Sequence, residues 1–77
     1  MNKSRRARIE IIIQQIEDIT SDIDLIREEE ETAYDNLPES IQESNRGEIM
    51  SEAISDLEDA ISYLEDVSEY LNNAKGE

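Results

Sequence analysis

Isoleucines recur along the first half of the chain in alternating steps of three and four residues. They form two rows, each repeating every seven residues, made of Ile9, Ile12, Ile16, Ile19, Ile23 and Ile26. Side chains at this spacing lie on one side of an α-helix. The pattern closes through Glu30, Ala33 and Leu37. It predicts a helix over residues 9–36, with the two rows as its core seam.

A second seven-residue repeat occupies the last part of the chain. Its apolar seam consists of Met50, Ile54, Leu57, Ile61, Leu64 and Leu71. Ser68 takes one core position of the same repeat. Beside the seam lies a row of four short side chains, Ala53, Ala60, Val67 and Ala74. Their small size would allow a partner helix to approach closely. Asn45 followed by Glu48 resembles a capping box, so we expect this helix over residues 46–74.

The segment between the two repeats, residues 37–45, has the composition of a turn. Pro38 disfavours helical geometry at Leu37, so the first helix is expected to end near Asn36. Residues 40–44 are long enough for one helical turn within this connection.

Side chains on both sides of the turn predict how its tip is held together. Tyr34 and Leu37 would pack at the tip of the hairpin. Arg46 would form an ion pair across the turn with an acidic side chain, either Asp35 or Glu39.

Two helices of similar length joined by a short connection favour an antiparallel hairpin. Ile11, Ile13 and Leu25 lie off the seam and widen the apolar stripe, which suits contact with more than one helix. A lone hairpin gains too little from burial to offset the entropy of ordering its residues. We therefore expect an all-α single domain, residues 1–77, in which two hairpins form a homodimeric four-helix bundle.

The formal net charge of −14 is unevenly distributed. Residues 1–8 form a basic N-terminal arm without an acid, containing Lys3, Arg5, Arg6 and Arg8. The other 69 residues carry three basic and 21 acidic side chains. Such a body repels nucleic-acid phosphates and anionic membranes. We therefore expect neither a membrane nor a nucleic acid as a direct partner.

The beginning of the chain superficially resembles a secretory signal, because basic residues precede isoleucines. Glu10, Gln14 and Gln15 interrupt the apolar run after a few residues, and no small-residue cleavage site follows. No stretch approaches the roughly 20 apolar residues of a membrane span. A cytoplasmic protein is the expectation.

The residue types present exclude several kinds of chemistry. The chain has no cysteine and no histidine. Disulfides, thiolate or imidazole metal sites, and nucleophile–base pairs built on Cys or His are therefore impossible. Paired carboxylates would need a cleft that separates their pKa values, and a helical hairpin offers none. We expect no catalytic residue, no cofactor, no metal site and no enzymatic activity.

The densest acidic run spans residues 28–31 and lacks the glycine turn and alternating oxygen ligands of a calcium loop. We interpret it as a solvated face that a protein partner could contact, made of Glu28, Glu29, Glu31 and Asp35. Glu30 is different because it falls on the seam. It would end the apolar core or set the register of packing.

The stretches EEEETAYDNLPESIQESNRGEIM (residues 28–50) and AISDLEDAISYLEDV (residues 53–67) resemble a group of small acidic proteins of Gram-positive bacteria and their phages. That group shows an acidic run, then A-[YF]-D-N-[LM]-P-E-[SG]-[LI]-Q, an R-G pair, and an acidic Leu/Ile/Ala helix. The most specific part is residues 34–42. The resemblance implies a helical hairpin and a phage origin, and it transfers no catalytic or binding residue.

These features predict a non-enzymatic, acidic coiled-coil protein that self-associates and acts through protein–protein interaction. A DNA mimic is the alternative, because a rigid bundle of carboxylates can occupy the DNA-binding groove of a restriction or CRISPR enzyme. Binding of nucleic acid through the basic arm is a weaker hypothesis, since four cations without neighbouring aromatic residues are a poor signal for it.

Overall fold

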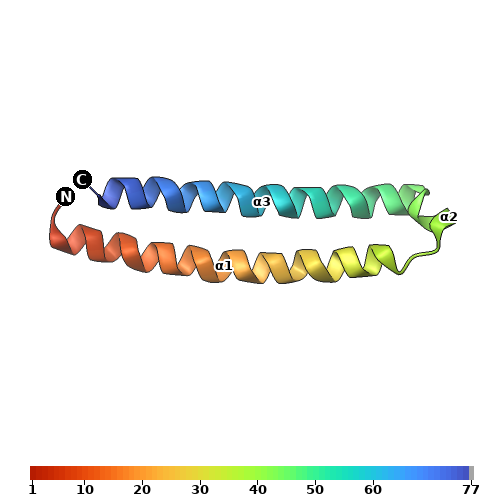
Figure 1. Cartoon of the computed structure of the whole chain (residues 1–77), viewed down its shortest axis with the longest axis horizontal. Coiled ribbons are helices and arrows are strands. Elements are labelled where there is room, and N and C mark those ends of the chain that lie inside the picture. The colour runs from red at the N-terminus through yellow and green to blue at the C-terminus, as the bar shows by residue number, and fades with distance from the viewer. Residues whose placement is uncertain (77) are drawn as a thin grey trace.

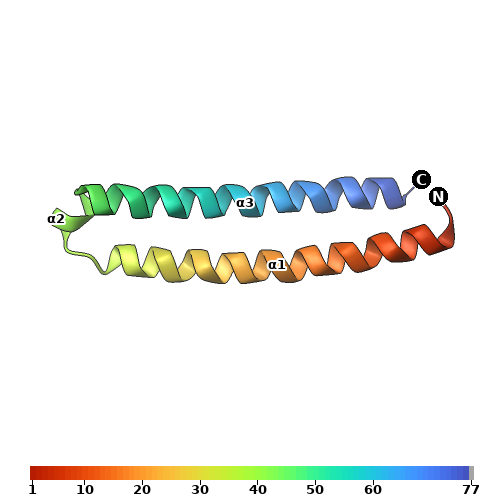
Figure 2. The same cartoon turned by 180° about the vertical axis from the view of Figure 1, so that it is seen from behind.

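The structure is a computed structural model that describes residues 1–76. It contains three helices, α1 (Lys3–Asp35), α2 (Glu39–Gln42) and α3 (Asn45–Lys75). The long helices α1 and α3 run antiparallel, with both termini at one end and α2 at the other (Figure 1). The view from behind shows the same single layer of two rods (Figure 2). The prediction of an all-helical antiparallel hairpin is confirmed.

Helix α1 begins six residues earlier than the sequence pattern predicts, at Lys3 rather than Ile9. Asn2 caps it, because its side-chain oxygen accepts a hydrogen bond of 2.8 Å from the backbone N–H of Arg5. Such a cap satisfies one of the backbone donors that a helix start leaves unpaired. The basic residues 3–8 are therefore the first turns of α1 and not a separate arm.

The turn follows the prediction at its first half. α1 ends at Asp35, and Asn36 forms its C-cap, where the first helix was expected to end. Pro38 then precedes the single turn of α2. The connection is fastened to α1 by Gln42, whose side-chain N–H donates a 3.0 Å hydrogen bond to the carbonyl oxygen of Tyr34.

The start of α3 differs from the capping-box prediction. Ser44, not Asn45, is the N-cap, and its side chain makes no capping bond. Its hydroxyl instead donates to the carbonyl oxygen of Ile41 in the preceding turn. Within residues 1–76, no ion pair joins Arg46 to Asp35 or to Glu39. Side-chain hydrogen bonds to backbone carbonyls, rather than the predicted ion pair, hold the tip.

The contact between the long helices is a thin line of half-buried side chains, and Ile13 alone among the apolar side chains of residues 1–76 is fully buried, at 5% exposure. On α3 the line follows the predicted seam, from Met50 to Leu71. On α1 it consists of Ile9, Ile13, Ile16, Thr20, Ile23, Arg27, Glu30 and Tyr34, and Leu37 continues it in the turn.

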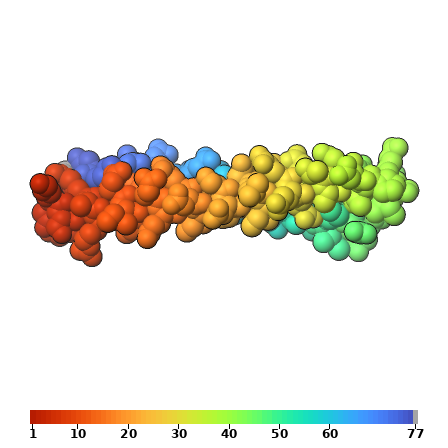
Figure 3. All heavy atoms as spheres, turned by 90° about the horizontal axis from the view of Figure 1, so that it is seen from below, coloured from red at the N-terminus to blue at the C-terminus, as the bar shows by residue number. Residues whose placement is uncertain are grey.

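The structure thus divides the predicted seam of α1 into two rows with different surroundings. Its first row, which includes Ile9 and Ile16, faces the contact line. The second row stays exposed, with Ile12, Ile19 and Ile26 at 44%, 50% and 53%. The hairpin is a narrow rod of 58 × 15 × 11 Å in its Cα extents, and its edge view shows α1 along the whole length (Figure 3).

Candidate interaction surface

Apolar side chains outside the contact line recur in one row on each long helix. The rows, which we call together the apolar face, consist of the exposed Ile12, Ile19 and Ile26 on α1, and of the half-buried Ala53 and Ala60 with the exposed Val67 on α3. Members of each row are seven residues apart, so each row runs nearly parallel to its helix axis. The α1 row is wholly isoleucine, which is the feature that distinguishes it from the rest of the surface.

Both rows lie on the same side of the hairpin. Each precedes a contact-line residue by one position, since Ile12 precedes Ile13 and Ala53 precedes Ile54. At about 100° per residue, each row is therefore turned by roughly 80° from the centre of the contact line, in the same rotational sense. Because α1 and α3 are antiparallel, equal rotations in the same sense bring the two rows to one side.

Larger apolar side chains border this face on α3. Ile49, Tyr63 and Tyr70 occupy the neighbouring row and are among the most exposed apolar residues of the chain. A tyrosine ring at such a border can cover apolar surface while its hydroxyl stays in water.

The opposite side of the hairpin is acidic. Acids among the residues that follow the contact line by one position form this acidic face, which consists of Glu10, Glu17, Asp24 and Glu31 on α1, and Glu58 and Glu65 on α3. A shallow hollow of about 320 Å³ bordered by Glu17, Thr20 and Glu65 places carboxylates of both helices on one side. The hairpin therefore separates an apolar face from an acidic one.

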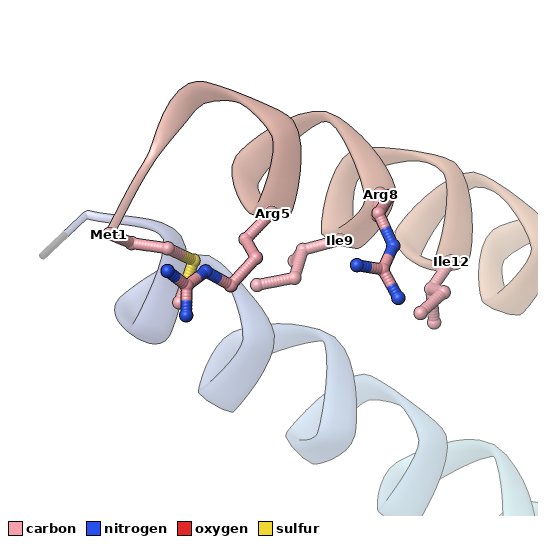
Figure 4. Close-up of a pocket in the computed structure, with 5 residues that line it drawn as sticks. All are labelled: Met1, Arg5, Arg8, Ile9 and Ile12. Carbon is pink, nitrogen blue, oxygen red and sulfur yellow. The ribbon is translucent and has the colours of Figure 1, made fainter.

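The terminal end of the apolar face is basic. Here a hollow of about 260 Å³ is lined by Met1, Arg5, Arg8, Ile9 and Ile12. Figure 4 shows these side chains along the start of the chain, with the guanidinium group of Arg8 between the two isoleucines and that of Arg5 beside Met1. Charged heads next to apolar side chains suit a partner that is apolar and also carries acids.

Two contacts tie the basic end of α1 to the last turn of α3. The guanidinium Nε of Arg6 donates a 3.1 Å hydrogen bond to the carbonyl oxygen of Lys75. The ammonium group of Lys75 in turn pairs with Glu10. A cation near the unpaired carbonyls of a helix C-terminus is favourable, so these contacts keep both ends of the chain together.

Arg27 is a half-buried basic residue on the contact line of α1, and sequence reasoning did not single it out. Its Nε lies 2.9 Å from Asp24, and its other nitrogens pair with Glu31 and Glu28. The hydrogen bond with Asp24 raises the pKa of Arg27, and the negative charges of the three acids add to that effect. One guanidinium thereby relieves repulsion among three carboxylates of α1.

The acids predicted to face a partner therefore do not all have the same surroundings. All four are exposed, but Glu28 and Glu31 pair with Arg27. Glu30 is half-buried on the contact line, at the position expected from the repeat. Within residues 1–76, no three acidic side chains cluster closely enough to hold a metal ion.

Gly47 was also missed, although the sequence places it in an R-G pair. It is buried, and a Cβ atom built on it would lie 1.9 Å from the carbonyl oxygen of Gln42. The turn can thus close onto α3 only because residue 47 has no side chain. A glycine at the second position of a predicted helix was the signal that could have found it.

Comparisons with protein-family models, with curated proteins and with solved structures found no match to this chain. None of the helices within residues 1–76 combines the length and the apolar character needed to cross a bilayer. The interpretation of the surface therefore depends on the geometry and charges described above.

Proposed function

We propose that this chain is a non-enzymatic, self-associating protein of the cytoplasm, and that the apolar face of one hairpin packs on that of a second copy to form a four-helix bundle. Its acidic face would then remain outside and contact other proteins. The sequence resemblance to small acidic proteins of Gram-positive bacteria and their phages supports a phage-related origin.

The observation that supports this proposal is which row of α1 side chains lies next to α3 and which row stays exposed. The row next to α3 includes Thr20 and Arg27, whereas the exposed row is Ile12, Ile19 and Ile26. A hairpin that acted alone would gain more by burying the isoleucines, at about 1.5–3 kcal/mol for each fully buried side chain. An exposed, wholly apolar row beside a more polar contact line is typical of a surface with a partner of its own.

The side of the hairpin that bears both rows is large enough for a dimer interface. The whole side measures 58 × 15 Å between Cα atoms, and a standard protein–protein interface buries about 800 Å² on each partner. The apolar rows occupy part of this length, about 21 Å on each helix, because each spans 14 residue steps of about 1.5 Å. A second copy supplies an apolar face of the same length and shape.

A matched pair of substitutions tests the proposal. Ile19→Asp places a charge in the middle of the apolar face, and we expect the variant to lose both the dimer and most of its helix. Leu25→Asp is the control, because Leu25 is similarly exposed, at 56%, but points away from both the contact line and the apolar face. Size-exclusion chromatography and circular dichroism would measure both effects. Equal behaviour of the two variants would contradict the proposal.

A second function, a DNA mimic of the anti-restriction or anti-CRISPR type, is favoured by the charge density. One chain carries a net −14 over 58 Å, about one charge per 4 Å, whereas duplex DNA carries one per about 1.7 Å. Two copies side by side would reach about one charge per 2 Å, close to the DNA value. Self-association would thus be a requirement for mimicry.

The test of mimicry is a pull-down from a bacterial lysate with duplex DNA as the competitor. Capture of a nuclease, helicase or repressor that DNA displaces supports mimicry, and capture of none contradicts it. The control is a variant with Glu17→Gln and Glu65→Gln, which lowers the charge of the acidic face and leaves the apolar face unchanged. This variant should still dimerise but capture less.

A further inference from the structure

We infer that the two copies lie antiparallel, so that the basic terminal end of each hairpin covers the acidic tip of the other. The inference rests on the self-association proposed above and adds the orientation and the register. It predicts which residues of the two copies meet, and it can fail while self-association stands.

Charge is polarised along the rod. The terminal end, residues 1–14 and 70–76, carries five basic side chains and one acid. The tip, residues 28–56, carries ten acids and one basic side chain, Arg46. A parallel dimer would place like ends together, and an antiparallel dimer places each basic end beside an acidic tip. Complementary potentials of this kind decide the orientation of an interface more than its affinity.

The isoleucine row has the symmetry that an antiparallel contact requires. Ile12, Ile19 and Ile26 are evenly spaced, so a two-fold axis through Ile19 pairs Ile12 of one copy with Ile26 of the partner subunit. Helix α1 then packs on α1 of the partner subunit, and the interface is isologous. The same axis lies near the level of Glu65 on α3, because Glu65 borders the hollow that contains Glu17 and Thr20.

Charged side chains that border the isoleucine row also favour the antiparallel orientation. The row next to the isoleucines on α1 contains Arg8 and Glu29. An axis through Ile19 brings Arg8 beside Glu29 of the partner subunit, twice in the dimer. In a parallel dimer α1 would pack on α3 instead, and Glu29 would meet Asp56 of the partner subunit. The first arrangement is attractive and the second repulsive.

The α3 side is complementary in shape. An axis near the level of Glu65 places Tyr70 over Ala60 of the partner subunit, and Tyr63 over Val67 of the partner subunit. The short side chains of α3 leave the space that the rings need. This accounts for large exposed rings on one row and small residues on the next.

Thiol cross-linking tests the orientation directly, because the native chain has no cysteine. We expect Ile19→Cys to cross-link to itself with a short bifunctional reagent. We also expect the Ile12→Cys and Ile26→Cys variants, when mixed, to form a heterodimer. A mixture of Ile19→Cys and Val67→Cys should give no mixed product. Mixed product in this last pair, or none in the first two, overturns the antiparallel orientation.

Charge reversal provides a second test that does not depend on cysteines. Arg8→Glu should weaken dimerisation about tenfold, because it places two pairs of like charges, residue 8 and Glu29 of the partner subunit, side by side. Adding Glu29→Arg should restore it, and a double variant no tighter than Arg8→Glu overturns the register. Sedimentation of the unmodified chain separates the two proposals. A monomer there refutes self-association, whereas a dimer with the wrong cross-links refutes only the orientation.

Discussion

Replacing Gly47 by alanine should destabilise the hairpin, against the usual effect of this change in a helix. Alanine is favoured over glycine inside a helix by about 1 kcal/mol. At position 47, however, the added Cβ atom would lie 1.9 Å from the carbonyl oxygen of Gln42, 2.4 Å from its carbonyl carbon and 2.7 Å from its Cα. All three are backbone atoms, so no change of side-chain rotamer relieves the overlap.

The size of the expected loss in stability depends on which part of the structure the added methyl group displaces. To admit the methyl group, the turn of α2 has to shift away from α3, which disturbs the hydrogen bond from Gln42 to Tyr34. Overpacking by a methyl group typically costs about 1–3 kcal/mol, and the bond about 1 kcal/mol more. After the gain in helix propensity, we expect a net loss of about 1–3 kcal/mol in the free energy of unfolding.

Urea denaturation followed by circular dichroism measures this loss, at several protein concentrations so that dimer dissociation is included. Gly76→Ala is the matched control, because the nearest atom to its added Cβ lies 3.4 Å away. That variant should be neutral or slightly more stable. Equal stability of Gly47→Ala and Gly76→Ala would contradict the close approach of the Gln42 backbone to residue 47.

Three further outcomes are expected. Raising salt from about 0.01 M to about 1 M should raise Tm, because the Debye length falls from about 30 Å to about 3 Å and repulsion among the acids weakens; a falling Tm would contradict this. Asn2→Ala should cost about 1 kcal/mol by removing the cap of α1, seen as faster amide exchange in its first turn, and unchanged exchange would refute the cap. Arg27→Gln should lower Tm because it leaves three carboxylates without their cation, whereas Arg46→Gln, at a residue outside the ion pairs described here, should have little effect; equal effects would refute that role.

The helices and the turn could be predicted from the sequence because their signals are local. The seven-residue repeats, Pro38 and the short connection each act on neighbouring residues, and they gave α3 and the end of α1 almost unchanged. The start of α1 was missed because the apolar pattern begins only at Ile9. The cap by Asn2 extends the helix through residues that contribute nothing to that pattern.

Which second row of α1 joins the row of Ile9 and Ile16 on the contact line could not be predicted. Residues 11–13 are all isoleucine. A rotation of α1 by roughly 100° about its axis therefore exchanges one apolar row for another with little change in composition. The structure selects the row of Ile13, and this row is continued by Thr20 and Arg27 rather than by apolar residues. Sequence periodicity shows that apolar rows exist, but not which neighbour covers each of them.

The central claim is that the apolar face is buried against a second copy of the chain. Sedimentation equilibrium of the unmodified protein tests it most directly, since one chain has a mass of 8.9 kDa. We expect the mass of two chains at concentrations where circular dichroism shows full helicity. A fully helical species with the mass of one chain would contradict the claim.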